Sequence, residues 1–240
     1  MALYIFSDAH LGANDLHKEA LKLARLERLF ALMREDADRV VILGDLFDFW
    51  FEYKHAIPKE HHDVLCRLRD LVLRGVRVDY VSGNHDFWMG DFFPNKIGVE
   101  LHRDGFDFDY DGKKVHCLHG DGLAKKDGGY RFLKCILRNP VNIWLYRKLP
   151  PDWAIPLAKK VSGSSREYTS KRDMDFVSDY EAYAMMKLNE GFDLVAIGHL
   201  HIPTIKGIGN GVYVNTGDFI ENFSYAKVVD GTTTLEYVRD

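Results

Sequence analysis

Five short polar segments, each at the end of an apolar run, carry side chains that can bind metal ions. In chain order they are SDAHLG (7–12), GDLFD (44–48), GNHD (83–86), LHGD (118–121) and GHLH (198–201). Asp and His side chains and an Asn carbonyl are ligands that suit Mn²⁺, Fe²⁺ or Zn²⁺, and the lack of thiolates argues against a structural zinc site. These residue types predict a binuclear metal centre.

The spacing inside the segments supports one shared centre. Asp8 and His10 are two residues apart, so they would share one face of an extended segment, and His199 and His201 repeat this spacing. Asp45 is the candidate bridging ligand, because one carboxylate has two oxygens and can reach two cations. A lone Gly-Asp pair is usually a turn and a lone loop histidine is usually on the surface, but the ordered set of five points to function.

The elements that must position these segments alternate between strand and helix patterns in the first half of the chain. Apolar runs at 2–6, 40–43 and 76–81 are typical of buried strands, and amphipathic patterns predict helices at 18–34 and 61–74. This alternation predicts β-α-β units around a sheet with parallel strands. Loops that follow the strand ends of such a sheet converge on one crevice, which would bring the polar segments together.

The second half predicts shorter strands and tight turns. Asp111-Gly112 and Asp230-Gly231 each indicate a hairpin, because Asp-Gly favours the positive φ that a two-residue turn needs. The strands that these turns would join, and two further strands, are expected at 106–110 with 113–118, 225–229 with 232–238, 194–197 and 211–214.

A helical stretch is expected at approximately residues 123–190, within a single domain of residues 1–240. Its part at 135–161 (CILRNPVNIWLYRKLPPDWAIPLAKKV) is rich in large apolar side chains, is interrupted by prolines and has Lys and Arg at its edges. Two alternatives are open. The stretch either buries its apolar face on the core or forms a lid that offers an apolar groove to a lipid-like ligand.

Composition limits the class of protein. With 240 residues, 46% hydrophobic and 28% charged, the chain has the apolar content for a sizeable core. A net charge of −4 argues against a nucleic-acid binder. Cys66, Cys117 and Cys135 form no CxxC pair, which fits a reducing cytoplasm better than a disulfide framework. The sequence lacks apolar runs typical of a signal peptide or a membrane span, so we expect a soluble, non-secreted protein.

The motifs Asp-x-His, Gly-Asp, Gly-Asn-His-Asp, His-Gly and Gly-His-x-His, in this order over residues 7–201, resemble the calcineurin-like metallophosphoesterase superfamily. The resemblance implies an α/β fold, a four-layer αββα sandwich of two mixed β-sheets, here with a helical lid insertion. It implies two divalent ions, with Mn²⁺ expected and Fe²⁺ or Zn²⁺ as alternatives. One ion would be held by Asp8, His10, Asp45 and His201, and the other by Asp45, Asn84, His119 and His199.

Two such cations can hold a hydroxide between them and clamp the oxygens of the attacked phosphoryl group. By the same resemblance, His85 lies near the phosphate, stabilises developing charge and protonates the leaving oxygen, so His85 and Asp45 are the catalytic candidates. Asp86 and Asp121 are candidates to bind the N–H groups of histidine ligands. An ordinary loop carboxylate is the alternative for Asp121.

The substrate is indicated by a second, narrower resemblance. The segments GDLFDFWFEYKHAIPKE (44–60), LHGDGLAKKDGGYRFLK (118–134) and SSREYTSKR (164–172) are similar to those of the UDP-2,3-diacylglucosamine pyrophosphohydrolases of lipid A synthesis. This implies hydrolysis of UDP-2,3-diacylglucosamine to UMP and 2,3-diacylglucosamine 1-phosphate. Asp127 and Tyr130 would lie near the glucosamine. Contacts from the lid to the phosphosugar and nucleotide are implied for Ser164, Arg166, Thr169, Lys171 and Arg172.

The types of those lid residues agree with this role, since Arg and Lys beside Ser and Thr suit an anionic group, although a solvated helix face is the alternative. Residues 135–161 would take the acyl chains. Such a substrate lies in a membrane, so the enzyme would be cytoplasmic and bind the cytoplasmic leaflet of the inner membrane peripherally. No nucleic-acid partner is expected, and the sequence leaves the oligomeric state open.

One position departs from the narrower family. The segment Gly-Asn-His-Asp at 83–86 has His85 where the best-known members carry arginine. Arginine is a fixed charge and a bidentate phosphate donor, whereas histidine can titrate. A metallophosphoesterase that acts on another nucleotide pyrophosphate or on a phosphodiester therefore stays open as the alternative. A non-catalytic scaffold fits less well, because all seven ligand positions are filled.

Overall fold

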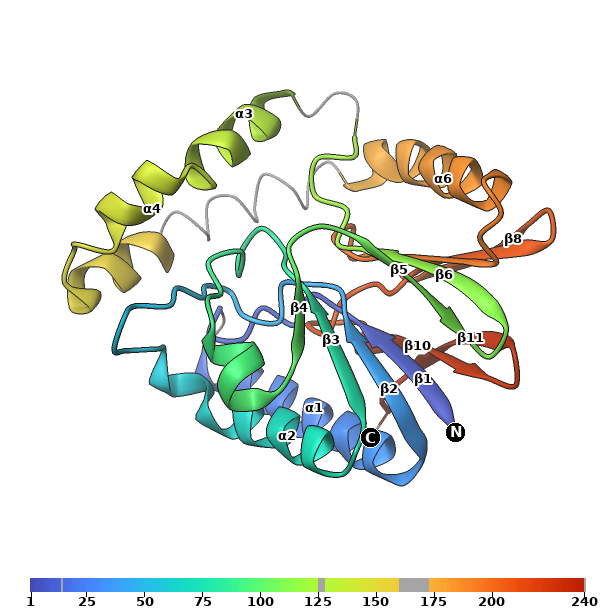
Figure 1. The fold of residues 1–240 in the computed structure, drawn as a ribbon, viewed down its shortest axis with the longest axis horizontal. Helices are drawn as coiled ribbons and strands as arrows, with labels where there is room; N and C mark the ends of the chain where they lie inside the picture. Colours follow the sequence, from blue (N-terminus) through green and yellow to red (C-terminus); the bar gives the residue numbers. More distant parts are fainter. Residues whose placement is uncertain (14, 125–127, 160–172, 240) are drawn as a thin grey trace.

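The computed structural model describes residues 1–239 apart from residue 14, residues 125–127 and residues 160–172 (Figure 1). Six of the strands are β1 (Ala2–Phe6), β2 (Ala37–Ile42), β3 (Arg77–Val81), β4 (Glu100–His102), β10 (Ser224–Val229) and β11 (Thr232–Tyr237). They form one sheet in the order β11-β10-β1-β2-β3-β4. Strands β1 to β4 are parallel, while β10 is antiparallel to both β1 and β11.

The second sheet has five strands, β5 (Phe106–Tyr110), β6 (Lys113–Leu118), β7 (Leu194–Ile197), β8 (Thr204–Ile208) and β9 (Gly211–Asn215). Their order is β5-β6-β7-β9-β8. The central strands β6, β7 and β9 are parallel, and the edge strands β5 and β8 are antiparallel to their neighbours. Both sheets are therefore mixed, as the sequence predicted.

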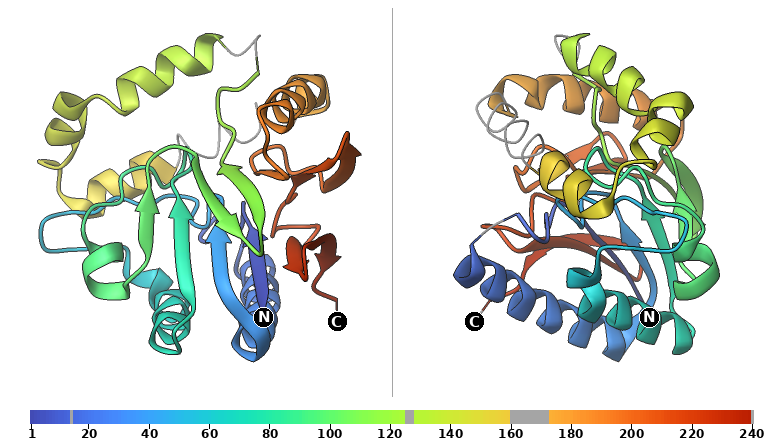
Figure 2. Two further views of the ribbon diagram at one scale, coloured as in Figure 1. Left: turned by 45° about the vertical axis from the view of Figure 1, so that its right-hand side comes forward. Right: turned by 90° about the vertical axis from the view of Figure 1, so that its left-hand side faces the viewer.

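Helices cover the outer faces of the two sheets (Figure 2). Helix α1 (Leu16–Asp36) begins at the cap residue Asp15, whose side chain accepts hydrogen bonds from the amides of His17 and Lys18. Helix α2 (His62–Leu73) follows a short helical turn, Lys59–His61, and another such turn spans Phe93–Ile97. Helix α6 (Asp173–Asn189) covers the second sheet.

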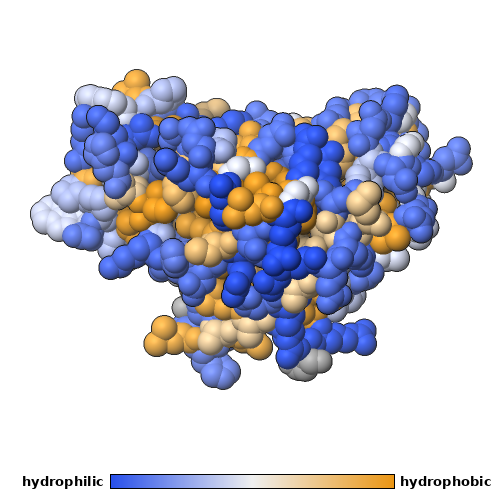
Figure 3. All heavy atoms as spheres, turned by 60° about the horizontal axis from the view of Figure 1, so that its bottom comes forward, coloured by the Kyte–Doolittle hydropathy of each residue, from blue (hydrophilic) through white to orange (hydrophobic). Residues whose placement is uncertain are grey.

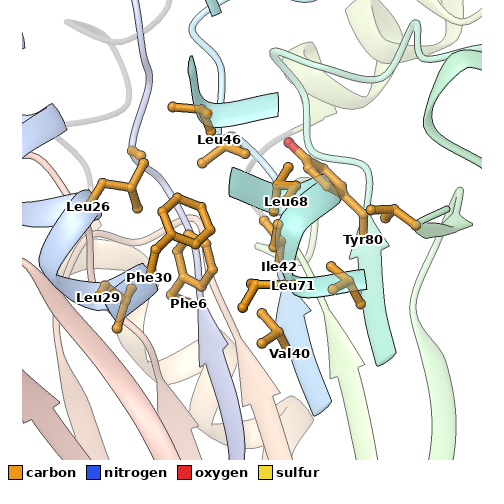
Figure 4. Packing of buried hydrophobic residues seen from close by; sticks show 14 of the residues in the cluster. Phe6, Leu26, Leu29, Phe30, Val40, Ile42, Leu46, Leu68, Leu71 and Tyr80 are labelled. Atoms are coloured by element: carbon orange, nitrogen blue, oxygen red, sulfur yellow. The ribbon is translucent and has the colours of Figure 1, made fainter. Parts of the chain in front are cut away.

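Strand β1 shows why four layers form. Tyr4 and Phe6 pack with α1 and α2, while Leu3 and Ile5 face the second sheet, as the two-residue period of a strand requires. Figure 4 shows the first of these cores, where Phe6, Val40 and Ile42 meet Leu26, Leu29, Phe30, Leu68 and Leu71. A third core joins α6 to the second sheet through Phe176, Tyr180 and Ala184. The predicted αββα sandwich is confirmed.

Most of the predicted elements are present, with ends shifted by a few residues at several of them. Two short strands, β4 and β8, had not been predicted. Strand β4 has three residues, and β8 contains a glycine and pairs on one side only, so neither carries a strong local signal. Asp111 and Asp230 have φ values of 51° and 48°, as the predicted hairpin turns require.

Helices α3 (Gly128–Leu137) and α4 (Pro140–Tyr146) stand away from the sheets (Figure 1). A further helical segment at 151–159 contains the buried residue Ala154 and contacts the main body, since Lys159 Nζ lies 3.0 Å from Glu60 Oε1. No residue of α3 or α4 is buried. Among the described residues, none of the helices is long and apolar enough to span a membrane. On the face drawn in Figure 3, hydrophobic patches are bordered by hydrophilic residues.

Candidate metal centre

The five polar segments meet because each follows a parallel strand, namely β1, β2, β3, β6 or β7. The pairing of β1 with β2 continues beyond the strands, since the Asp8 amide donates to Gly44 O at 3.1 Å and the His10 amide donates to Asp45 O at 2.9 Å. In the other sheet, the Gly198 amide donates to His119 O at 3.0 Å. The loops are thus held by extensions of the ladders that define the sheets.

Five of the seven predicted ligands have left-handed backbone conformations. Their φ values are 55° at Asp8, 42° at His10, 53° at Asp45, 70° at His199 and 53° at His201. Such conformations cost about 1–3 kcal/mol each in a non-glycine residue and persist only where the surroundings fix them. Strain concentrated on the predicted ligands is the pattern expected of a functional site.

Two glycines allow the loops to approach one another. Gly44 has a φ of 87°, and a Cβ there would lie 2.8 Å from His119 Nδ1. A Cβ on Gly83 would lie 2.0 Å from Asp45 Oδ1. Gly44 therefore serves both a positive φ and close packing, whereas Gly83 serves packing alone.

The first half of the centre brings together Asp8, His10, Asp45 and His201. Oδ1 of Asp8 lies 3.3 Å from His201 Nε2 and 3.7 Å from His10 Nε2. His10 Nε2 also lies 3.7 Å from Asp45 Oδ2. Asp8, His10 and Asp45 are buried, and His201 is partly exposed.

The second half brings together Asp45, Asn84, His119 and His199. His119 Nε2 lies 3.5 Å from Asp45 Oδ2, 3.0 Å from Asn84 Oδ1 and 3.2 Å from His199 Nδ1. The carboxylate of Asp45 thus faces both halves, which is the position that a bridging ligand needs. The structure places all seven predicted ligands around one small volume.

Hydrogen bonds from the backbone orient the ligand atoms. Asp8 accepts from the His199 amide through Oδ2 at 2.9 Å, which leaves Oδ1 toward the histidines. Asp45 accepts from the His85 amide through Oδ1 at 2.9 Å, which leaves Oδ2 toward them. His119 Nδ1 lies 2.6 Å from Leu43 O, so this nitrogen donates and Nε2 is the ring nitrogen left to face a cation.

The residues fit a pair of divalent cations. Oδ1 of Asp8 and both ring nitrogens of His10 are buried and have no hydrogen-bond partner among the described residues. Buried polar atoms without partners are rare and cost about 1–3 kcal/mol each. An oxygen and nitrogen donor set without thiolates suits cations of the Mn²⁺, Fe²⁺ and Zn²⁺ type.

The electrostatics of the centre also call for positive charge. Burial alone would lower the pKa of His119, but the Asp45 carboxylate raises it to about 10. Burial would also lower the pKa of His10, but the carboxylates of Asp48 and Asp8 raise it to about 9. At Asp45, burial would raise the pKa, but His119 and His85 hold it far below its usual value. The carboxylates therefore stabilise any cation placed among them.

Asp48 belongs to this centre, although its role was not predicted from the sequence. Its Oδ1 lies 3.8 Å from His10 Nδ1 and 3.7 Å from His85 Nδ1, and its carbonyl lies 2.9 Å from His85 Nδ1. The carbonyl of Asp48 thereby fixes the ring of His85, and its carboxylate faces the rings of both histidines. The available signal was its place in GDLFD, three residues after Asp45 in the same loop.

Asp86 and Asp121 do not bind histidine N–H groups as expected. Asp86 accepts from the Tyr80 hydroxyl at 2.5 Å and the Gly83 amide at 2.8 Å, so it shapes the 83–86 turn. Asp121 binds Tyr130, Lys134 and Arg138 of the α3 region, at 2.8, 2.7 and 3.2 Å. The difference arises because a backbone carbonyl already accepts from the second nitrogen of His119.

A cavity of about 430 Å³ opens beside the centre. Asp48, Asn84 and His85 line it at the metal centre, and Tyr130 lines it too. The rest of its wall is mainly apolar. It includes Phe49 and Trp88 of the loops at the strand ends, and Leu133, Ile136, Ile143 and Leu157 of residues 128–159. The other predicted substrate contacts, Asp127, Ser164, Arg166, Thr169, Lys171 and Arg172, lie outside the described residues.

Comparison with known proteins places this centre in a family. A family model for calcineurin-like phosphoesterases matches residues 1–203. A UDP-2,3-diacylglucosamine hydrolase of Porphyromonas gingivalis is 30% identical over 261 residues, which cover 99% of this chain and 98% of that protein. The Azotobacter vinelandii protein of the same name is 31% identical over 207 residues, which cover 85% of this chain and 83% of that protein.

A solved structure of an archaeal phosphodiesterase has the same fold. It covers 98% of this chain and 99% of its own, with a TM-score of 0.52 at 12% identity. The family match spans all five segments that meet at the centre. The chain belongs to the calcineurin-like phosphoesterases and is a metal-dependent hydrolase.

Proposed function

We propose that this enzyme hydrolyses the pyrophosphate of UDP-2,3-diacylglucosamine to UMP and 2,3-diacylglucosamine 1-phosphate, a step of lipid A synthesis. The names of the curated relatives support this substrate. The observation that carries the proposal is the apolar cavity that meets the metal centre at Asn84 and His85. A substrate with a phosphoryl group beside an acylated sugar requires this combination of a cationic centre and an apolar cavity.

We assign one ion to Asp8, His10, Asp45 and His201 and the second to Asp45, Asn84, His119 and His199, with Mn²⁺ as the proposed metal. When bound, two such ions neutralise charge on the attacked phosphoryl group and lower the pKa of water. The protein contributes preorganised geometry, because the backbone fixes the free oxygens of Asp8 and Asp45 before substrate arrives.

His85 is the proposed contact to the phosphoryl group outside the ligand set. Its ring is held through Nδ1 by the Asp48 carbonyl, and Nε2 lies 3.8 Å from Asp45 Oδ2. Its side chain also lines the apolar cavity, so it lies where the centre and the acylated half of the substrate meet. Burial lowers the pKa of His85, and Nδ1 already donates to the Asp48 carbonyl, so the ring gives a proton from Nε2 to the leaving oxygen only in its imidazolium form, in which it also stabilises charge on the phosphoryl group.

The lid is the proposed binding element for the acyl chains. Helix α6 is a layer of the sandwich, so we assign the lid to residues 128–159 of the longer stretch 123–190. The lid, rather than a core-packed subdomain, is favoured because α3 and α4 bury no residue while Leu133, Ile136, Ile143 and Leu157 line the cavity. Tyr130 at its base would contact the sugar.

The outer side of the lid is the proposed site of peripheral binding to the cytoplasmic leaflet of the inner membrane. Trp144 and Trp153 are 57% and 77% exposed, and Lys148 Nζ lies 5.1 Å from the centroid of a Trp144 ring. Exposed aromatic rings beside cationic side chains suit the interface of an anionic membrane.

The proposed reaction is tested with metal-loaded protein and UDP-2,3-diacylglucosamine in ¹⁸O-labelled water, with products read by mass spectrometry. We expect the label in UMP, which corresponds to attack on the uridine-side phosphorus. Label in the sugar phosphate would contradict this regiochemistry. Turnover of simple phosphodiesters or unacylated nucleotide sugars, without turnover of the acylated one, would instead support the alternative hydrolase.

A further inference from the structure

Lys22 is a fully buried lysine beneath the loop that carries Asp8 and His10. It lies in α1, and its side chain is 1% exposed. Its ammonium donates hydrogen bonds to the carbonyls of Ala9 at 2.9 Å and His10 at 2.7 Å. Lysine is almost never fully buried unless it is paired, so this placement calls for a reason.

The other polar groups of the loop are held from different directions. The Asp8 and His10 amides donate to the 44–45 segment, and the Asp8 carbonyl accepts from the Phe219 amide at 3.0 Å. Lys22 binds the carbonyl of Ala9, which lies between the ligands Asp8 and His10, and the carbonyl of His10 itself. With it, the amides of Asp8 and His10 and the carbonyls of Asp8, Ala9 and His10 all have partners, which stabilises the left-handed conformations of the two ligands.

Glu19 offsets the charge of Lys22. Its Oε2 lies 3.1 Å from the Lys22 ammonium, and its Oε1 accepts from the Gly12 amide at 2.8 Å. Because this carboxylate is adjacent, the charge that Lys22 adds to the neighbouring metal centre is largely cancelled. The contribution of Lys22 to metal binding is therefore geometric more than electrostatic.

We infer that Lys22 is a positioning residue, which sets the affinity for the ion at Asp8, His10 and His201 by holding the backbone of the 8–10 loop. This inference rests on the proposed binuclear site. Residues that orient metal ligands typically change metal affinity by about 10- to 100-fold when they are replaced.

The test compares chelator-stripped wild type with Lys22→Met, Lys22→Arg and the matched control Lys18→Met, which changes an exposed lysine of the same helix. Mn²⁺ binding is followed by electron paramagnetic resonance, and urea unfolding of the metal-free proteins gives their stability. In Lys22→Met, one of the two Mn²⁺ ions should bind about 10- to 100-fold more weakly. Lys22→Arg, which keeps charge and donors, should recover part of the affinity, and Lys18→Met should match wild type.

Turnover adds a second readout. The kcat of Lys22→Met should approach the wild-type value at saturating Mn²⁺, with KM for substrate unchanged. Folded Lys22→Met that binds both ions as wild type does would overturn the inference, and tighter binding would mean that charge dominates over geometry.

If Lys22→Met does not fold, Lys22→Gln, which keeps a polar end but is shorter than lysine, reports on the same two carbonyls. Because this change also removes a positive charge near the cations, weaker binding of one Mn²⁺ ion would reflect lost geometry, and unchanged or tighter binding would overturn the inference. A wild-type protein that binds no Mn²⁺ would instead refute the proposed metal site, so the two failures are distinguishable.

Discussion

The carboxylate of Asp121 accepts a hydrogen bond from the Tyr130 hydroxyl, 2.8 Å away, and so joins the loop that carries His119 to the first helix of the lid. Lys134 and Arg138 of the same region bind this carboxylate as well. One side chain of the loop that follows β6 therefore anchors three residues of the lid. Because His119 is only two residues away, lid position and ligand position are linked through one short loop.

Asp121→Asn should loosen the lid. The change leaves Lys134 without its carboxylate partner and Arg138 with only the exposed carboxylate of Asp104, and hydrogen bonds to charged groups contribute roughly 1.5–3 kcal/mol. We expect KM for the diacylated substrate to rise on the order of tenfold or more, with a smaller effect on a soluble phosphodiester. Asp104→Asn is the control, since Asp104 is exposed and lies 3.7 Å from Arg138. Equal losses on both substrates would contradict a lid-specific role.

Asp45→Asn should weaken both metal sites. The substitution replaces one anionic oxygen of the residue that faces both histidine groups, at 3.7 Å from His10 and 3.5 Å from His119. Metal content by mass spectrometry should fall for both ions, and turnover should be lost while circular dichroism stays native. Retention of two ions would exclude a bridging role, and full activity in chelator-stripped wild type would exclude metal dependence.

The sequence predicted that the five polar segments meet, because their strands are strongly apolar and their loops follow strand ends, whereas the assignment of each ligand came from the resemblance to the superfamily. It could not predict features that depend on packing. Asp48 looks like any loop carboxylate until the rings of His10 and His85 lie against it. A lysine in an amphipathic helix is predicted to be solvent-exposed. Lys22 is buried only because α1 packs beneath the 7–12 loop.

Asp79→Asn should remove a pH-dependent part of the stability. Asp79 is buried between the sheets, 2.9 Å from both Arg39 Nε and His102 Nε2. Burial alone would raise its pKa, but His102 and Arg39 lower it below the ordinary value. Because the folded pKa is depressed, the stabilisation is complete above the unfolded value of about 3.9 and is lost as pH falls through the folded value.

At pH 7, the loss from Asp79→Asn should be about 3–5 kcal/mol in urea unfolding, because a buried charge pair is broken. The difference from wild type should shrink below about pH 4. Glu100→Gln breaks an exposed pair with Arg77 and should cost less than about 1 kcal/mol. A difference that stays constant from pH 7 to pH 3 would show that Asp79 acts through shape rather than charge.

Replacing Trp144 and Trp153 with Ala should weaken binding to vesicles that contain anionic lipid. Burying one large apolar side chain is worth roughly 1.5–3 kcal/mol, so each substitution should lower the partition coefficient on the order of tenfold. Leu16→Ala is the control, because Leu16 is 91% exposed but lies at the start of α1. Co-sedimentation that is unchanged in the double variant would argue against the lid as the membrane-binding surface.

Ala158→Trp should change which acyl chains the enzyme accepts. Ala158 and Leu157 line the cavity from the helical segment at 151–159, whereas His85 and Asn84 line it at the metal centre. A bulky ring at 158 would fill space that an acyl chain occupies, and each methylene that no longer fits costs about 0.8 kcal/mol, roughly a fourfold loss in kcat/KM. Substrates with long acyl chains should therefore lose activity progressively, while short-chain analogues and a soluble phosphodiester keep it. Val141→Trp places the same ring on an exposed position of α4 and should leave the chain-length profile unchanged. A uniform loss across all chain lengths in Ala158→Trp would mean that the cavity supports the metal centre rather than binding the lipid.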